Sequence, residues 1–323
     1  MAEIIVSLLV TAAIPTSIVT VIFLLRRRMS KDNPPSFRQW VQESGQAIAI
    51  TLAICLGISL VFQWTGFFES QYYQPRRTDD EEQKRLGLDP EPFQFNSKDG
   101  TQLHGWVLRS KKQPAKDTVI HFHGSGRNIT FWIKDVAWLA DNGYDVVMFD
   151  YRGFGESQGS PDREGVIADA TAAIKEVRSS KEIGAERIIL WGQSLGGQLA
   201  IVAADRAGVD SIECVIADAT YASYSLHIKD KTARMGPLWL TQWANWVTTS
   251  DDGSAILCVG NLGVPLLLIH GTKDDVVQPY HSERLFKQAA EPKEIWRVEG
   301  AGHLDVLRDA RWQAKLIEYL DSV

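Results

Sequence analysis

More than any other feature, the fold of this chain is constrained by the eight residues 190–197, which read LWGQSLGG. This G-x-S-x-G stretch lies between a strand-like apolar run, 188–191, and a helix-forming run, 198–204. A serine at a sharp strand-to-helix turn is held in a strained backbone conformation that pushes its hydroxyl out of the sheet. The residues two before and two after it crowd each other, and Gly192 and Gly196 are small enough. The context therefore favours Ser194 as an exposed nucleophile over a plain tight turn.

The chain beyond residue 90 alternates between strand-like and helical patterns. An opening hairpin is indicated by Phe93–Phe95 and Leu103–Leu108, which flank the turn residues Lys98-Asp99-Gly100. Further strands are predicted at Thr118–Phe122, Asp145–Phe149, Arg187–Trp191, Ile212–Ala217, Pro265–His270 and Ile295–Val298. Helices are predicted at Ile129–Asn142, Asp162–Ser179, Ser194–Arg206, His281–Ala290 and Val306–Leu320. This order predicts an α/β fold, with a mostly parallel sheet and helices on both faces.

Polar residues follow two of the later strands, at the carboxyl ends where chemistry gathers in such sheets. Asp274 lies in the loop after 265–270, and His303 lies in a glycine-flanked loop after 295–298. The chain order Ser194, Asp274, His303 is the nucleophile–acid–base order of α/β-hydrolases. Two other carboxyls stay open as the acid: Asp275, which is adjacent, and Asp218, which ends the strand at 212–217.

A glycine-rich turn follows the first parallel strand and reads HFHGSG over residues 121–126. The backbone N–H of Ser125 in this turn and that of Leu195, at the start of the nucleophile helix, are predicted to donate to an oxyanion. The competing interpretation is metal binding by His121 and His123, which share a strand face. No partner Asp/His cluster follows at the spacing of a metalloenzyme, so neither a metal nor a cofactor is expected.

Two apolar runs precede the globular part. Ile4–Leu25 carries no charge and is long enough to cross a bilayer. The basic residues Arg26-Arg27-Arg28 follow this run, whereas a signal peptide carries its positive charge before it. The second run, Ala47–Phe62, extends towards Phe68. Aromatic residues at its far end resemble an interfacial belt: Trp64, Phe67, Phe68, Tyr72 and Tyr73. Both runs stand apart from the globular part, which favours transmembrane helices over buried core helices.

These features predict the domain organisation. The predicted segments are a transmembrane helix at 1–25, a basic cytoplasmic loop at 26–46, a second transmembrane helix at 47–68, a charged linker at 69–90 and an α/β-hydrolase domain at 91–323. Residues 26–46 carry five Lys/Arg and two Asp/Glu, so the positive-inside rule places this loop in the cytoplasm. The catalytic domain is then extracytoplasmic, at a bacterial inner membrane. Arg76-Arg77, just past the second run, argues against this orientation.

Composition limits the possible partners of the protein and the possible roles of its cysteines. The formal net charge of -6 argues against nucleic acid as a partner. The three cysteines, Cys55, Cys214 and Cys258, form neither a disulfide framework nor a C-x-x-C metal site. Buried free thiols are favoured over a bridge between Cys214 and Cys258.

The chain resembles the α/β-hydrolase-fold serine hydrolases, and it is most similar to their membrane-anchored group, which has bacterial members and depalmitoylase-like eukaryotic relatives. The resemblance rests on HGSG at 123–126, FDYRGFGES at 149–157, GQSLGG at 192–197, IHGTKD at 269–274 and GH at 302–303. It implies Ser194 as nucleophile, Asp274 as acid and His303 as base. It also implies the backbone N–H groups of Ser125 and Leu195 as the oxyanion hole. Relatives often have HGNAGN where this chain has HGSGRN, and many have one anchor rather than two.

An insertion between Ala217 and Val264 is predicted to be a small helical cap over about 219–263. In such folds a cap of this kind covers the serine and shapes an acyl pocket. The pocket residues predicted here are Tyr221, Tyr224, Trp239 and Trp243. Two alternatives stay open. In the first, the insertion only packs against the sheet. In the second, Trp239, Trp243 and Trp246 enter the membrane surface and deliver lipid-borne substrates.

These residues predict a membrane-anchored serine hydrolase, similar to carboxylesterases and thioesterases. It would cleave an ester or thioester acyl bond through an acyl-enzyme. The expected partners are a small acyl ester, thioester or lipid-like substrate and the membrane. An aminopeptidase-like serine peptidase is one alternative, in which Asp218 or Asp275 holds the substrate amine. A non-catalytic membrane scaffold is the other, and the intact triad argues against it.

Overall fold

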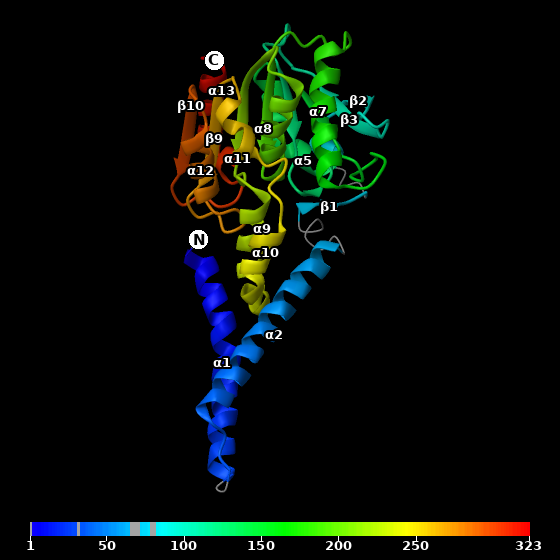
Figure 1. The fold of residues 1–323 in the computed structure, drawn as a ribbon. Coiled ribbons are helices and arrows are strands. Elements are labelled where there is room, and N and C mark those ends of the chain that lie inside the picture. The colour runs from blue at the N-terminus through cyan, green and yellow to red at the C-terminus, as the bar shows by residue number, and fades with distance from the viewer. Residues whose placement is uncertain (1, 31–32, 65–71, 78–81) are drawn as a thin grey trace. The chain divides into compact units, whose positions relative to one another are not determined.

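The structure is a computed structural model, and it describes residues 2–30, 33–64, 72–77 and 82–323 (Figure 1). The chain forms two compact units, which are described separately. Residues 69–223 and 251–323 form the first, here called the sheet unit. Residues 1–68 and 224–250 form the second, here called the helical unit. The middle of the predicted cap thus belongs to the same unit as the two apolar helices.

The sheet unit contains an eight-stranded sheet in the order β10-β9-β8-β7-β4-β6-β3-β2. Its strands are β2 (Glu91–Asn96), β3 (Gln102–Leu108), β4 (Thr118–Phe122), β6 (Asp145–Phe149), β7 (Ile188–Gln193), β8 (Ile212–Asp218), β9 (Leu266–Gly271) and β10 (Lys293–Val298). Strand β3 is antiparallel to both β2 and β6, and the remaining neighbours are parallel. Every residue of β4, β6, β7 and β9 is buried, as expected for parallel strands with helices on both faces.

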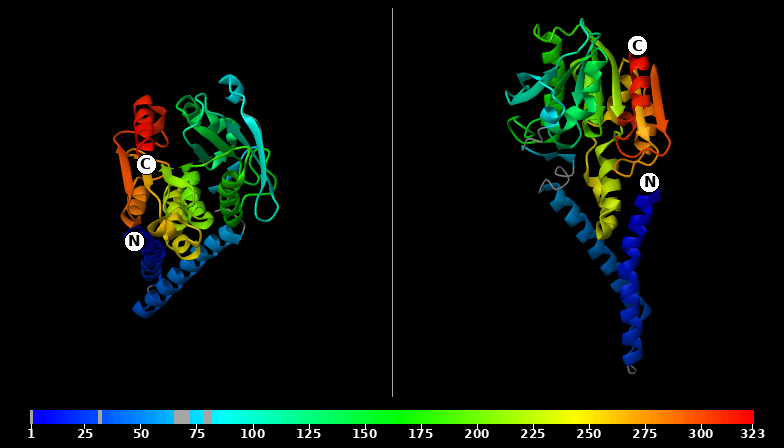
Figure 2. Two further views of the ribbon diagram at one scale, coloured as in Figure 1. Left: turned by 90° about the horizontal axis from the view of Figure 1, so that it is seen from above. Right: turned by 180° about the vertical axis from the view of Figure 1, so that it is seen from behind.

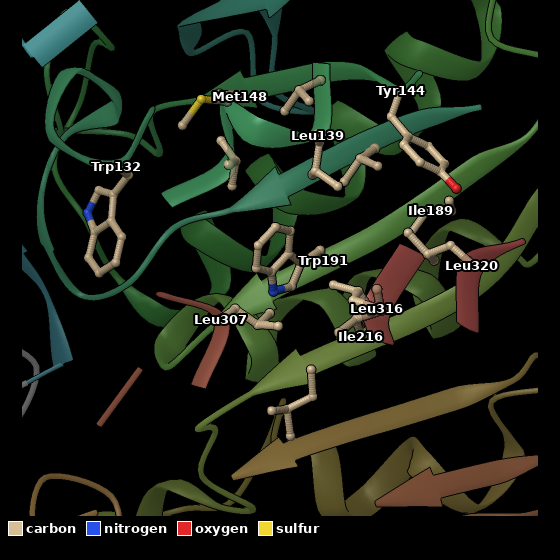
Figure 3. Close-up of a cluster of buried hydrophobic side chains, with 14 of the residues drawn as sticks. Trp132, Leu139, Tyr144, Met148, Ile189, Trp191, Ile216, Leu307, Leu316 and Leu320 are labelled. Carbon is tan, nitrogen blue, oxygen red and sulfur yellow. The ribbon is translucent and has the colours of Figure 1, made fainter. Parts of the chain in front are cut away.

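Helices cover both faces of this sheet, as the view from above makes clear (Figure 2). The helices are α5 (Ile129–Val136), α6 (Trp138–Asp141), α7 (Arg163–Ser179), α8 (Leu195–Ala207), α11 (Ala255–Cys258), α12 (Tyr280–Gln288) and α13 (Ala310–Leu320). Trp191 and Ile216 point from the sheet into a cluster with Leu139 and Leu316 (Figure 3). This cluster joins α5, α6 and α13 to one sheet face.

Short elements complete the sheet unit. They are β1 (Gln74–Pro75), which pairs in parallel with β5 (Gly126–Arg127), the helix α4 (Glu82–Arg85), and the 3-10 turns η2 (Val259–Asn261) and η3 (Val306–Arg308). The bond from Gln74 N–H to the carbonyl oxygen of Ser125 is 2.7 Å long and continues this pairing into the glycine-rich turn. The segment that follows the second apolar helix is thereby fixed beside that turn.

The predicted fold class is confirmed, and the predicted strands at 118–122 and 145–149 match β4 and β6. Two predicted helices are interrupted. The helix predicted at 129–142 is divided at Ala137, where an i to i+3 bond from Ala140 N–H tightens the turn. The helix predicted at 306–320 begins only at Ala310, because the Asp309 side chain accepts a hydrogen bond from the N–H of Arg311 and caps it.

The helical unit contains α1 (Ala2–Met29), α2 (Phe37–Trp64), α9 (Tyr224–Ala233), the 3-10 helix η1 (Gly236–Thr241) and α10 (Gln242–Thr248). Helices α1 and α2 include apolar segments, Leu8–Met29 and Phe37–Phe62, that are long enough and apolar enough to cross a bilayer. The indole N–H of Trp40 donates to the hydroxyl of Thr20 over 3.0 Å, and Arg26 pairs with Glu43 at 3.2 Å. These contacts join the two helices near their connection.

Helix extends into both ends of the predicted loop 26–46, since α1 continues to Met29 and α2 starts at Phe37. The division of this part of the chain into a cytoplasmic loop and two spans stays a prediction. Tyr72 and Tyr73 do not belong to an exposed aromatic belt, since both are buried and the Tyr72 ring lies 6.2 Å from that of Tyr221. Phe67 and Phe68 of that belt, and residues 69–71 and 78–81 of the charged linker, lie outside the described residues.

Candidate active site

Ser194 occupies the turn between β7 and α8. Its φ of 55° and ψ of -113° lie in a region that non-glycine residues seldom adopt. Three hydrogen bonds hold this conformation. The N–H of Ser194 donates to the carbonyl oxygen of Asp218 over 2.8 Å, and its own carbonyl oxygen accepts from Gly197 N–H at 3.1 Å and from the Thr220 hydroxyl at 2.8 Å. The backbone strain expected of an exposed serine at a strand-to-helix turn is therefore present at Ser194.

Two glycines permit this turn. A Cβ atom on Gly192 would overlap the carbonyl of Gly196, so the two positions crowd each other. A Cβ atom on Gly196 would overlap the carbonyl oxygen of Phe122, at the end of β4. Helix α8 can begin at Leu195, beside the neighbouring strand, only because both positions lack a side chain.

His303 and Asp274 come together from two different loops. Asp274 follows β9 and His303 follows β10, and His303 Nδ1 lies 2.7 Å from Asp274 Oδ2. The other carboxylate oxygen accepts the backbone N–H groups of Val276 and Val277, each over 2.9 Å. Burial opposes ionisation of Asp274, but the hydrogen bonds from His270 and His303 outweigh it and hold the pKa of Asp274 below its usual range. A buried, ionised carboxylate thus orients the imidazole and directs Nε2 away from it.

His270 lies in the motif IHGTKD at 269–274, but no catalytic or binding role is predicted for it from the sequence. Its Nε2 lies 3.2 Å from Asp274 Oδ2 and 2.9 Å from the carbonyl oxygen of Val277. Its Nδ1 lies 2.6 Å from the hydroxyl of Ser282 on α12. His270 is therefore a positioning residue that fixes the loop of Asp274. The spacing of a histidine and an aspartate by four residues across a strand end is the signal that points to it.

The two other candidate acids lie elsewhere. Asp275 is exposed, and the histidine contact described above is made by Asp274. Asp218 is fully buried at the end of β8, where Gln193 Nε2 is 3.5 Å from its Oδ2. Burial raises the pKa of Asp218 to about 7, against the opposing hydrogen bond from Gln193. Gln193 Oε1 in turn lies 2.9 Å from His121 Nε2, so a buried polar chain runs behind the turn at Ser194.

The glycine-rich turn after β4 is held on several sides. His123 Nδ1 lies 2.7 Å from the carbonyl oxygen of Gly124, and the indole N–H of Trp132 donates to that of Gly126 over 2.7 Å. A Cβ atom on Gly124 would come 2.8 Å from the Trp132 ring. These contacts fix the backbone around Ser125. The donor roles of the Ser125 and Leu195 N–H groups stay predictions.

His121 and His123 are buried. Burial lowers the pKa of His121 to about 4, against a hydrogen bond with Gln193. It lowers the pKa of His123 to about 3, against a hydrogen bond with the Gly124 backbone. Among the described residues, no three His, Cys, Asp or Glu side chains form a group that could hold a metal ion. Cys55, Cys214 and Cys258 are all free thiols.

The four predicted pocket residues are divided between the two units. Tyr221 belongs to the sheet unit, in the loop that follows β8, and it is buried. Tyr224 begins α9, Trp239 lies in η1 and Trp243 lies in α10, all in the helical unit. Their role as a pocket stays a prediction.

Several known proteins are similar in sequence to a large part of this chain. A family model described as the alpha/beta hydrolase fold matches residues 117–256. The protein YfhR of Escherichia coli K12 is 35% identical over 250 residues, which cover 74% of this chain and 84% of YfhR. The alpha/beta hydrolase domain-containing protein WAV2 of Arabidopsis thaliana is 28% identical over 217 residues, covering 64% of this chain and 68% of WAV2.

A solved structure shares the fold. The esterase Pf2001 of Pyrococcus furiosus superposes with a TM-score of 0.65 at 21% identity, covering 78% of this chain and 98% of the esterase. This chain therefore belongs to the α/β-hydrolase family, and the resemblance inferred from its motifs is confirmed.

Proposed function

We propose that this protein is a membrane-anchored serine hydrolase that cleaves an ester or thioester acyl bond. The observation that carries the proposal is the 2.7 Å contact between His303 Nδ1 and Asp274 Oδ2. The loops of both residues, and the turn of the strained Ser194, follow the carboxyl ends of parallel strands in one sheet. The family supports a hydrolase, whereas the nucleophile, the bond cleaved and the anchoring are our proposal.

The proposed reaction is acyl transfer to water. His303 Nε2 takes the hydroxyl proton of Ser194 as Oγ adds to the carbonyl carbon. Asp274 keeps His303 in the required tautomer and stabilises the imidazolium. The N–H groups of Ser125 and Leu195 hold the oxyanion, and loss of one such donor typically costs about 3 kcal/mol. The bond to the leaving oxygen or sulfur breaks as His303 returns the proton, and water then releases the acid by the same steps.

The membrane part of the proposal rests on α1 and α2. Their apolar segments are of spanning length, and the basic residues at the end of α1 and around the connection support a cytoplasmic connection by the positive-inside rule. The catalytic domain is then extracytoplasmic, at the inner membrane of a bacterium. Because YfhR of Escherichia coli is a relative, a bacterial setting is consistent with the comparisons.

The test is labelling of the full chain, in detergent or liposomes, by a fluorophosphonate probe. The Oγ of an activated serine attacks the phosphorus of the probe, fluoride leaves to solvent, and the serine keeps a covalent phosphonyl tag. We expect labelling of the wild type and of Ser160→Ala, which removes an exposed hydroxyl. We expect no labelling of Ser194→Ala. Absence of labelling in folded wild type would overturn the hydrolase proposal in favour of the scaffold alternative.

A substrate series then separates the enzyme classes. Aryl esters and thioesters of increasing acyl length are compared with aminoacyl amides of similar size. Faster turnover of esters or thioesters supports the proposal. Preferential cleavage of amides with a free amino group would favour the peptidase alternative, in which Asp218 or Asp275 holds that amine.

A further inference from the structure

Within the helical unit, the charge-free segment 236–248 packs between the two apolar helices. Helices α1 and α2 diverge from their connection, and α10 lies between their outer halves (Figure 1). The segment reads GPLWLTQWANWVT and contains no charged residue. Charged residues flank it in the chain, with Lys231 and Arg234 before it and Asp251 and Asp252 after it. A neutral tip between charged flanks is typical of a segment that enters a membrane.

Hydrogen bonds attach this segment to both apolar helices. The hydroxyl of Thr11 on α1 donates to the carbonyl oxygen of Leu240 over 3.1 Å. The hydroxyl of Ser59 on α2 donates to Asn245 Oδ1 and lies 3.3 Å from the hydroxyl of Thr248. Thr11 and Ser59 are both 0% exposed, and Asn245 is 1% exposed. Such hydroxyl and amide contacts hold helices together in an apolar environment.

The positions of these contacts give the depth of the segment. Thr11 and Ser59 both lie inside the spanning segments, Leu8–Met29 and Phe37–Phe62. Thr11 is nine residues from the start of α1 at Ala2, and Ser59 is five residues from the end of α2 at Trp64. At about 1.5 Å per residue, the contacts lie about 13 Å and about 7 Å inside those helix ends. If the helices cross a bilayer, the residues that bind Thr11 and Ser59 lie in the same layer.

Apolar side chains of the segment face outward at this depth. Val247 is 67% exposed and Trp246 is 42% exposed. Apolar side chains close in sequence to Thr11 and Ser59 are also exposed, with Leu9 at 62% and Leu60 at 51%. Hydrocarbon is the environment that suits such a surface, since exposure of large apolar groups to water is unfavourable.

We propose that residues 236–248 are inserted into the outer hydrocarbon layer of the bilayer, docked between α1 and α2. The inference rests on the proposed membrane anchoring and deepens the proposed function. The loop 219–223, in which Thr220 donates to the carbonyl oxygen of the proposed nucleophile Ser194, continues in the chain through α9 into the inserted segment. The substrate class we assign is therefore an acyl ester or thioester whose acyl chain resides in the bilayer.

The docking is tested with engineered disulfides in the full chain, with Cys55, Cys214 and Cys258 replaced by alanine. The pair Ser59→Cys and Asn245→Cys is expected to cross-link under mild oxidation in liposomes. The matched control joins Asn245→Cys to Leu52→Cys, two helical turns away on nearly the same face of α2, and is expected to stay reduced. Equal cross-linking of the two pairs, or none in the first, would overturn the docking.

The insertion is tested by fluorescence. In the same cysteine-free chain, Val247→Cys carries an NBD label in liposomes that contain doxyl-labelled phosphatidylcholine. Quenching by the doxyl lipid and protection from iodide are expected. The control label at Ser179→Cys, an exposed residue at the end of α7, is expected to show the reverse. An NBD label at residue 247 that iodide quenches and doxyl lipid does not would overturn the inference.

The consequence for substrates is tested with Val247→Asp, because a carboxylate at this position opposes insertion. We expect the ratio of activity on a long-chain ester in vesicles to activity on a soluble short-chain ester to fall about tenfold. Leu257→Asp, at a site 61% exposed on α11 of the sheet unit, is the control and is expected to leave the ratio unchanged. An unchanged ratio in Val247→Asp would overturn the assigned substrate class.

The two proposals fail separately. Quenching needs no turnover, so the label at residue 247 is also measured with Ser194→Ala. Fluorophosphonate labelling without quenching would leave the hydrolase and remove the insertion. Quenching by doxyl lipid without fluorophosphonate labelling would leave the insertion and remove the hydrolase.

Discussion

His303 Nδ1 and Asp274 Oδ2 lie 2.7 Å apart, although 29 residues separate them in the chain. Parallel pairing of β10 with β9 brings their loops together, with Val298 opposite Gly271 at the ends of the strands. The N–H groups of Val276 and Val277 hold the second carboxylate oxygen, so the carboxylate has one orientation. The order of these residues in the chain predicted that Asp274 and His303 pair. The register of β10 against β9 brings them together.

Replacement of Asp274 tests the assignment of the acid. We expect Asp274→Asn to lower kcat by about 10³- to 10⁴-fold, because the amide favours the wrong tautomer of His303 and does not stabilise its imidazolium. Asp275→Asn removes the neighbouring exposed charge and is expected to change kcat less than about twofold. Hydrolysis of a soluble aryl ester measures both. A larger loss in Asp275→Asn than in Asp274→Asn would reverse the assignment.

Gly196 is expected to tolerate no side chain. In Gly196→Ala the new methyl group would overlap the carbonyl oxygen of Phe122, so β4 or α8 must move. Overpacking of this kind typically costs about 1–3 kcal/mol, and here it also displaces the N–H groups near Ser194. Thermal unfolding in detergent, followed by circular dichroism, should show a clear drop in midpoint. Gly126→Ala is the control, since nothing lies within 4 Å of its Cβ position. Equal midpoints for the two variants would contradict the close approach.

Local chemistry made much of this fold predictable from sequence. Strands β4 and β6 are short apolar runs bounded by polar residues, and both are buried throughout. Helix α7 follows Asp162, whose side chain accepts the N–H of Gly165 as an N-cap. The positions of Asp274 and His303 after neighbouring strands predicted that their two loops meet.

Other features depend on contacts that no local pattern encodes. The chain of His121, Gln193 and Asp218 needs three strands in register, with His121 on β4 beside β7 and Gln193 opposite Asp218. Hydropathy located the apolar part of α2 but missed its start at Phe37, because polar helix formers extend a helix without an apolar signal. The burial of Tyr72 depends on Tyr221, about 150 positions later in the chain.

Asp218 is expected to make the stability of the sheet unit depend on pH. Its side chain is fully buried, and one carboxylate oxygen, Oδ1, has no hydrogen-bond partner among the residues that the structure describes. Burial raises the pKa of this carboxyl to about 7, whereas a carboxyl in an unfolded chain titrates near 3.9. Between about pH 4 and pH 7 the folded state therefore holds a proton that the unfolded state has lost. The free energy of unfolding must then fall as the pH rises through this window.

Asp218→Asn removes the titrating group and keeps the shape of the side chain. At pH 5 wild-type Asp218 is protonated in the folded state but mostly ionised in the unfolded state, so the variant should already be more stable by about 1.5 kcal/mol. At pH 8 the wild type holds a buried, ionised carboxylate, so the variant should be more stable by on the order of 2–4 kcal/mol. Unfolding in detergent at both pH values measures the difference, and Asp275→Asn corrects for the loss of one exposed charge. A stability gain that is the same at pH 5 and pH 8 would mean that Asp218 has the same pKa in the folded and the unfolded protein. Folding would then leave no extra proton on the buried side chains behind Ser194.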